Sequence, residues 1–127
     1  MQKDSKMYLI GGLIAAVVIV GLVVYLVKKD AGGPGPLDGF TTCLKDEGAV
    51  FYGTFWCPHC IATKRLFGKS AKLLPYVECS TPDGNAQLKV CADEKIEVYP
   101  TWTFKDGSRL TGEVSLETLS QKTGCLI

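Results

Sequence analysis

An uncharged and strongly apolar segment near the N-terminus, Met7 to Val27, most restricts how this chain can fold. At about 1.5 Å per residue, a helix of this length spans roughly 30 Å, the hydrocarbon thickness of a bilayer. No face of such a helix would be polar, so a buried helix of a soluble core is a poor alternative. The segment predicts a transmembrane anchor through residues 7–27, with the lipid bilayer as its partner.

The two ends of this segment also suit a membrane-spanning helix. Tyr8 and Tyr25 lie near its ends, where amphipathic rings favour the membrane interface. A cleaved signal peptide is the main alternative, but its apolar region is usually about 7–15 residues long and ends in a small-x-small cleavage site. Here the segment is longer, and Lys28-Lys29-Asp30 follows it at once. We favour an uncleaved anchor, and both interpretations place the rest of the chain outside the cytosol.

Flanking charge does not decide the orientation of the anchor, because two lysines precede it and two follow it. The six cysteines are more informative, since all of them lie beyond the anchor, and such a density is typical of an oxidising compartment. We expect a cytosolic N-terminus and a folded domain outside the cytosol, in a periplasm, at the cell exterior or in a secretory lumen. A net charge of +1 gives no electrostatic case for a nucleic-acid partner.

Composition divides the chain into three parts. Residues 1–30 are a tail and the anchor, residues 31–36 are a linker of glycine and proline, and residues 37–127 form one soluble domain. In that domain, hydrophobic periodicity and turn signals predict helices over 38–47, 58–69 and 85–95, a last helix between Ser115 and Gly124, and strands over 49–55, 76–79, 101–104 and 109–111. This order predicts an α/β domain with a central mixed sheet and helices on both faces.

The motif Cys57-Pro58-His59-Cys60 carries the chemistry of the chain. The strand predicted before it and the helix predicted after it place Cys57 at a helix N-terminus, where the dipole and free N–H groups stabilise a thiolate. Pro58 then falls in the first turn, where its missing N–H is harmless. A stable thiolate beside a second cysteine exchanges with other disulfides. The motif predicts a redox-active disulfide between Cys57 and Cys60, with no other cofactor and no metal.

Several runs of sequence around this motif resemble a known family. The order of elements and the motif are similar to the thioredoxin fold. The thioredoxin-like domain fused to vitamin K epoxide reductase homologues in bacteria and plants is similar over Phe51–Cys60, Pro75–Ser80, Asn85–Gln87 and Tyr99–Trp102. The resemblance covers about residues 49–124. One departure is large, because the quinone-reducing four-helix membrane domain of those homologues is replaced here by a single span.

The resemblance implies a role for each site residue. Cys57 is the exposed attacking thiol, and Cys60 is the buried resolving thiol. Pro100 is cis and lies against the Cys57 sulfur. The catalytic set is then Cys57, Pro58, His59, Cys60 and Pro100, and the client-binding set is Trp56, Tyr99 and Thr101. Trp56 and Trp102 could line an apolar client groove, with core packing as the alternative for both.

His59, between the two cysteines, bears on the direction of the reaction. A partly charged imidazole there favours the Cys57 thiolate, and a central Pro-His pair resembles oxidising disulfide donors, with potentials near about −120 mV against about −270 mV for thioredoxin. An exposed histidine without a role is the alternative. A second departure is Phe51, because thioredoxins keep a buried acid at that place, six residues before the first cysteine. We expect water or the client to serve as the base for Cys60.

The other four cysteines differ in how the sequence predicts their pairing. Cys79 and Cys91 match a second pair in those homologues, and we favour a structural disulfide, worth on the order of 3 kcal/mol, over an electron relay. Cys43 and Cys125 lie outside the matched motifs. Their pairing is disfavoured, because we expect the first and last helices of the domain to cover opposite faces of the sheet. Free thiols or a bridge between two chains stay open.

Together these patterns predict a membrane-anchored thiol–disulfide oxidoreductase that oxidises cysteine-containing client proteins outside the cytosol. By resemblance, a membrane quinone reductase of the vitamin K epoxide reductase type would reoxidise it. A reductase or isomerase of client disulfides is the alternative within the enzyme class, and a non-catalytic assembly subunit is the alternative outside it. A zinc site is disfavoured, because the two best cysteine pairs are one close and one widely spaced pair, with only one histidine in the chain.

Overall fold

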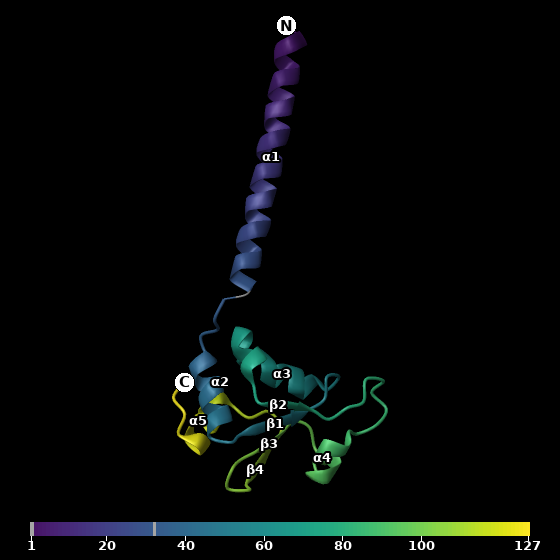
Figure 1. Cartoon of the computed structure of the whole chain (residues 1–127), viewed down its shortest axis with the longest axis vertical. Coiled ribbons are helices and arrows are strands. Elements are labelled where there is room, and N and C mark those ends of the chain that lie inside the picture. Colours follow the sequence, from purple (N-terminus) through teal and green to yellow (C-terminus); the bar gives the residue numbers. More distant parts are fainter. Residues whose placement is uncertain (1, 32) are drawn as a thin grey trace. The chain divides into compact units, whose positions relative to one another are not determined.

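A computed structural model describes the backbone of residues 2–31 and 33–127 and the side chains of residues 7–29 and 33–127. Gly32 of the expected linker, and the side chains of Lys3 and Lys6 before the anchor, lie outside the described residues. The chain separates into two compact units, Met1–Gly33 and Pro34–Ile127, and each is considered by itself (Figure 1).

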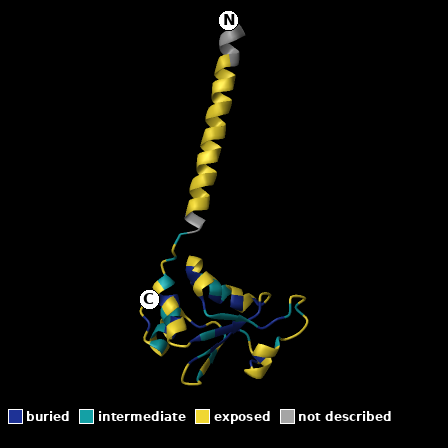
Figure 2. Ribbon diagram, in the orientation of Figure 1, coloured by how far each residue is buried: buried dark blue, intermediate teal, exposed yellow. Residues whose placement is uncertain are grey.

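The first unit is one long helix, α1, which runs over Gln2–Ala31. Within its stretch Met7–Lys29, a window of 18 residues has a mean hydropathy of 2.8, and the side chains are exposed along the whole stretch (Figure 2). This helix is long and apolar enough to span a membrane. A signal sequence near an N-terminus can have the same length and composition. The helix continues past the expected end of the anchor and includes Ala31, the first residue of the expected linker.

A mixed sheet of four strands forms the centre of the second unit. The strands are β1 (Val50–Gly53), β2 (Tyr76–Glu78), β3 (Thr101–Thr103) and β4 (Arg109–Thr111), in the order β2-β1-β3-β4. β1 pairs in parallel with β2, and the other pairings are antiparallel. The parallel pair needs a crossover connection, which the helical segment between β1 and β2 provides. The predicted mixed sheet is therefore confirmed.

Helices cover both faces of this sheet. They are α2 (Asp38–Asp46), α3 (Pro58–Leu66), the 3₁₀ helix η1 (Gly68–Leu73), α4 (Lys89–Asp93) and α5 (Leu116–Thr123). Successive residues of a strand point to opposite faces, and β1 shows this clearly. Phe51 belongs to a core that includes residues of α2, α3 and α5, whereas Tyr52 belongs to a smaller core with Cys91 of α4. The flanking helices predicted for an α/β domain are confirmed.

Two predicted helices are shorter than the sequence indicated. The helix expected over 85–95 covers only Lys89–Asp93, because Gln87 forms a bridge with Ser80 and the preceding residues make a turn. The helix expected over 58–69 ends at Leu66, and Gly68, the first residue of η1, takes a positive φ of 52°. In both places a backbone turn replaces the helical hydrogen bonds that the apolar spacing favoured.

The expectation for Cys43 and Cys125 was wrong, because these residues form a disulfide with an S–S distance of 2.03 Å. The reason lies in the placement of the helices. α2 and α5 do not cover opposite faces of the sheet, since Phe40 and Leu44 of α2 share one core with Leu119 of α5 (Figure 1). The bridge joins the first helix of the domain to its C-terminal end, across 82 residues of sequence.

The expected linker is also partly built into the second unit. Gly35 donates its N–H to Asp38 Oδ2 at 3.0 Å, and Leu37 donates its N–H to Ser70 Oγ at 3.0 Å. A Cβ added at Gly35 would lie 2.1 Å from the same Ser70 oxygen, so only glycine fits this approach. These contacts hold residues 35–37 against η1. This end of the expected linker is therefore part of the folded domain.

Candidate active site

The two cysteines of the motif lie where β1 leads into α3. Cys57 is the N-cap residue of α3, with an extended backbone, and Pro58 opens the helix, as the motif predicted. Among the described residues, Cys57 and Cys60 are the cysteines outside disulfides. Cys57 is less exposed than expected, at 5%, and Cys60 has no exposed surface at all. The first sulfur is therefore the one that a client can reach.

The loop before β3 passes directly beside the first sulfur. The Tyr99–Pro100 peptide bond is cis, and Pro100 is fully buried. The Cys57 thiol points at the carbonyl oxygen of Tyr99, with an Sγ···O distance of 3.8 Å. The cis bond expected at Pro100 is therefore present, and the backbone of Tyr99 borders the sulfur.

The two thiols of the pair differ in burial, and burial sets the acidity of Cys60. Burial raises the pKa of the Cys60 thiol to about 12, and the neighbouring Cys57 adds to the rise. Room for the Cys60 sulfur depends on Gly53, the last residue of β1, because a Cβ there would lie 2.8 Å from Cys60 Sγ. Cys60 is therefore a protonated, enclosed thiol in the reduced protein near neutral pH.

His59 lies on the outer side of the motif and contacts an acid that the sequence did not indicate. Its Nδ1 lies 2.6 Å from Glu113 Oε1, and the two side chains are 65% and 50% exposed. Glu113 belongs to the segment between β4 and α5, so 54 residues separate the pair in sequence. The contact joins the imidazole of the motif to the segment after β4.

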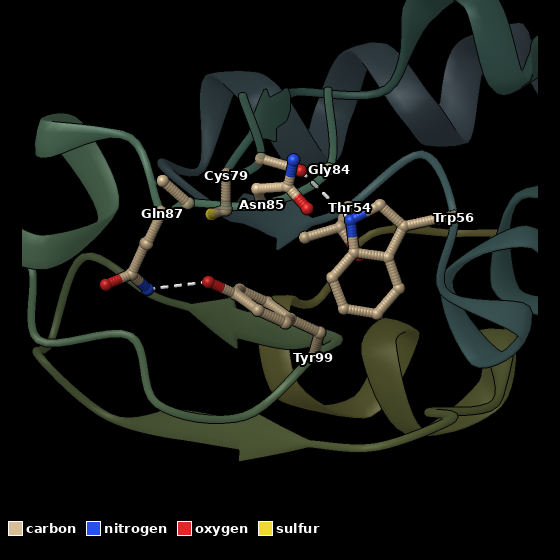
Figure 3. Close-up of a pocket in the computed structure, with 9 residues that line it drawn as sticks. Thr54, Trp56, Cys79, Gly84, Asn85, Gln87 and Tyr99 are labelled. Carbon is tan, nitrogen blue, oxygen red and sulfur yellow. Dashed lines mark hydrogen bonds between the residues drawn. The ribbon is translucent and has the colours of Figure 1, made fainter. Parts of the chain in front are cut away.

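A cavity of about 200 Å³ opens between Trp56 and Tyr99, next to the motif (Figure 3). Their rings meet edge to face with centroids 6.4 Å apart. Trp56 Nε1 donates to Ser80 Oγ at 2.9 Å, and Gln87 Nε2 donates to the Tyr99 hydroxyl at 2.6 Å. These bonds hold the two aromatic side chains in place beside the cysteine pair. The cavity is therefore a candidate binding site for residues of a client protein.

Two residues suggested for client contact lie elsewhere. Thr101 is buried in β3, and its hydroxyl donates to the carbonyl of Val98 at 2.7 Å. Trp102 has no exposed surface and stacks on Phe51 with centroids 4.8 Å apart. Trp102 therefore packs in the core and does not line a groove, and Thr101 offers no exposed side chain. Trp56, at 51% exposed, is the tryptophan available to a client.

A group of polar residues near the buried sulfur of the pair was not anticipated from the sequence. Lys64 of α3 places its Nζ 3.3 Å from the ring centre of Tyr76 on β2. The Tyr76 hydroxyl donates to Glu78 Oε2 at 2.7 Å. The one signal in the sequence is the spacing of Lys64, four residues after Cys60, which puts both on one side of a helix.

Cys79 and Cys91 form a disulfide, with an S–S distance of 1.99 Å and a Cα–Cα distance of 5.5 Å. Both residues are fully buried, among Tyr52 and Ile96. The bridge ties α4 to the chain just after β2, at the floor of the cavity between Trp56 and Tyr99. Its position accounts for how so short a helix is held against the sheet.

Comparison with known proteins gives a partial match. No family model matches this sequence. A curated relative, the thiol-disulfide oxidoreductase LTO1 of Arabidopsis thaliana, is 48% identical over 86 residues, which cover 64% of this chain and 22% of the relative. This chain thus spans less than a quarter of that relative's length. The likeness, together with the paired cysteines, supports a thiol–disulfide redox role for the domain.

Proposed function

We propose that this chain is a membrane-anchored enzyme that oxidises dithiols of client proteins outside the cytosol through a disulfide between Cys57 and Cys60. The observation that carries this proposal is the unequal pair at the start of α3. One sulfur is reachable and lies at a helix N-terminus, and the other is enclosed and strongly favours its protonated form. Such a pair accepts attack at one sulfur only.

The proposed reaction has two exchange steps. A client thiolate attacks Cys57 Sγ, the disulfide bond breaks, and its electron pair passes to Cys60 Sγ, which takes up a proton. A second client thiolate then attacks the client sulfur of the mixed disulfide and releases Cys57 as a thiolate. The client gains a disulfide, and the Cys57–Cys60 pair gains two electrons.

The cavity beside the pair supports binding of a client chain. Trp56 and Tyr99 supply apolar surface within reach of Cys57, and the Tyr99 backbone borders the sulfur. A client residue next to the reacting cysteine would occupy the cavity and bring its own sulfur to Cys57. Binding of this kind holds the two sulfurs in position for exchange, which lowers the entropic cost of the reaction.

The reduced pair would be reoxidised by a membrane quinone reductase of the vitamin K epoxide reductase type. The support for this partner is the resemblance of the domain to those fused to such reductases. α1 would keep the domain at the bilayer surface, where attachment to one membrane raises the effective concentration of the two proteins. In this arrangement the N-terminus lies in the cytosol and the cysteines lie on the oxidising side.

The test of this function is a reaction between the oxidised full-length chain, in detergent micelles, and a reduced synthetic peptide that carries two cysteines. We expect the peptide to lose its thiols in proportion to the protein, and Cys57→Ser to abolish the loss. Cys43→Ala with Cys125→Ala serves as a control, because their bridge lies outside the motif and the double change leaves no new thiol. A chain that leaves the peptide reduced, yet when reduced itself cleaves a peptide disulfide, is a reductase and contradicts the proposed direction.

A further inference from the structure

Cleavage of the Cys57–Cys60 disulfide leaves a thiolate on a sulfur without solvent contact. Cys60 is fully buried, and burial raises the pKa of its thiol to about 12. A thiolate formed there near neutral pH must take up a proton, and the reverse reaction must remove one. A neighbouring group that exchanges a proton would therefore serve both directions of the reaction.

β1 supplies no such group from the core. Its residues are Val50, Phe51, Tyr52 and Gly53, and none of them is acidic. Phe51 is fully buried, and it stacks on Trp102. Outside the motif, the charge that acts on Cys60 is that of Lys64 on α3, and Lys64 contacts Tyr76 of β2, the edge strand of the sheet. Lys64 and its neighbours are therefore the groups to consider for proton exchange with Cys60.

Lys64, Tyr76 and Glu78, here called the Lys64 cluster, are joined by direct contacts. Lys64 Nζ lies over the Tyr76 ring, and the Tyr76 hydroxyl donates to Glu78 Oε2. Glu78 Oε1 also accepts the backbone N–H groups of Phe55, at 3.2 Å, and Ser80, at 2.9 Å. Three donors hold this carboxylate, which in turn fixes the tyrosine beneath the ammonium group.

The Lys64 cluster meets the buried sulfur above Gly53. A Cβ built on Gly53 would lie 2.8 Å from Cys60 Sγ and 3.1 Å from Tyr76 Cε2, so the sulfur and the ring share the space that the glycine leaves. Lys64 follows Cys60 by one helical turn, on the same side of α3. Its positive charge acts on the Cys60 thiol, against the larger effect of burial on the pKa.

We propose that Lys64 is the proton donor and acceptor for Cys60, with Tyr76 and Glu78 as positioning residues, which rests on the exchange reaction proposed above. When the Cys57–Cys60 bond breaks, the Cys60 sulfur keeps the electron pair, and the Lys64 ammonium gives it a proton. Solvent returns a proton to the amine. In the reverse direction the amine takes the proton from the thiol.

The acidity of the cluster suits this role. Burial lowers the pKa of Lys64, while the charges of Glu78 and Cys60 oppose the change. Burial, with Glu78 in addition, raises the pKa of Tyr76, so its hydroxyl stays a donor. The titratable groups that act on the site from α3 and β2 are Cys57, Cys60, Lys64, Tyr76 and Glu78. The three cluster residues are half-buried, so solvent can return a proton to the Lys64 amine.

The test is the pH dependence of the reaction between the oxidised full-length chain in detergent and a two-cysteine peptide, with rate constants expressed per client thiolate. Stopped-flow tryptophan fluorescence follows the reaction. The rate constant of the unaltered chain should fall on the alkaline side, as Lys64 loses its proton. Lys64→Met should lower it about tenfold or more and remove the alkaline fall. Lys72→Met, an exposed lysine of η1, should change neither.

Two conservative variants separate proton transfer from charge and from folding. Lys64→Arg keeps the charge but cannot release its proton, so it should not restore the rate. Glu78→Gln keeps the shape but removes the charge that raises the Lys64 pKa, so the alkaline fall should move to lower pH. Both variants should retain the thermal transition of the unaltered chain.

Any of three results would overturn the role of Lys64: full activity in Lys64→Arg, an alkaline fall at unchanged pH in Glu78→Gln, or a loss in Lys72→Met equal to that in Lys64→Met. Each of these results leaves the exchange reaction itself in place. An unaltered chain that does not react with the peptide at any pH would instead refute the proposed function.

Discussion

Cys57 and Cys60 belong to the core on one face of the sheet and Cys79 and Cys91 to the core on the other, and the surroundings of these two pairs differ. Cys79 and Cys91 are joined and fully enclosed by the smaller core. Cys57 and Cys60 are free, and Cys57 retains a little exposure beside a cavity and a helix N-terminus. The comparison teaches that access to one sulfur, more than the presence of two, separates a reactive pair from a structural one.

The largest expected effect is a difference in reactivity within the motif itself. In the reduced full-length chain at pH 8, we expect iodoacetamide to modify Cys57 at least about a hundredfold faster than Cys60. The raised pKa of Cys60 keeps it a thiol until the pH approaches about 12, and the thiolate is the nucleophile. Mass spectrometry of timed samples measures the ratio. Equal labelling of both cysteines would show that the enclosure of Cys60 is wrong.

Removal of the enclosed disulfide should affect stability and leave the chemistry intact. We expect Cys79→Ala with Cys91→Ala to lower the free energy of unfolding by about 2–5 kcal/mol, because the bridge holds the short helix α4. Denaturant unfolding in detergent, with the Cys57–Cys60 pair kept oxidised, gives the value. Loss of client oxidation in a folded double variant would instead indicate an electron relay through this bridge.

A smaller effect is expected where β1 passes beneath the buried sulfur. Gly53→Ala adds a Cβ at 2.8 Å from Cys60 Sγ, and we expect a loss of about 1–3 kcal/mol in the free energy of unfolding from overpacking. Gly39→Ala is the matched control, because a Cβ at that position in α2 meets nothing within 4 Å. The control should be stabilising by up to about 1 kcal/mol. Equal stability of the two variants would contradict the close approach.

The smallest effect concerns the histidine of the motif. His59→Ala should lower the reduction potential of the Cys57–Cys60 pair by on the order of 30 mV, about tenfold in the equilibrium constant, because the residue between the two cysteines is expected to stabilise the reduced pair. Equilibration with glutathione buffers measures the shift. An unchanged potential would make His59 an exposed residue without a redox role.

Local signals in the sequence predicted much of the fold. Ser115 caps α5 by accepting the N–H of Thr118 at 3.1 Å, and Gly124 ends that helix with a φ of 77°. The turn between β3 and β4 contains Gly107, which also has a positive φ. These features depend on residues within a few positions of one another, so a single sequence contains them.

Contacts between distant segments were harder to predict. The Cys43–Cys125 bridge depends on α2 and α5 sharing one face, which helix order alone did not reveal. The motif predicted the reactive pair, but its polar neighbours come from other elements. Glu113 reaches His59 from the segment after β4, and Glu78 joins Tyr76 on an edge strand. In the sequence these two acids carry no local signal that distinguishes them from other surface residues.

One measurement tests the difference between the two pairs most directly. The full-length chain in detergent is equilibrated over a series of reducing potentials, and mass spectrometry of alkylated samples reads each cysteine pair separately. We predict that Cys57–Cys60 becomes reduced above about −180 mV, while Cys79–Cys91 stays oxidised to below about −300 mV. Reduction of both pairs at one potential, or of Cys79–Cys91 first, would contradict the assignment of a reactive and a structural pair.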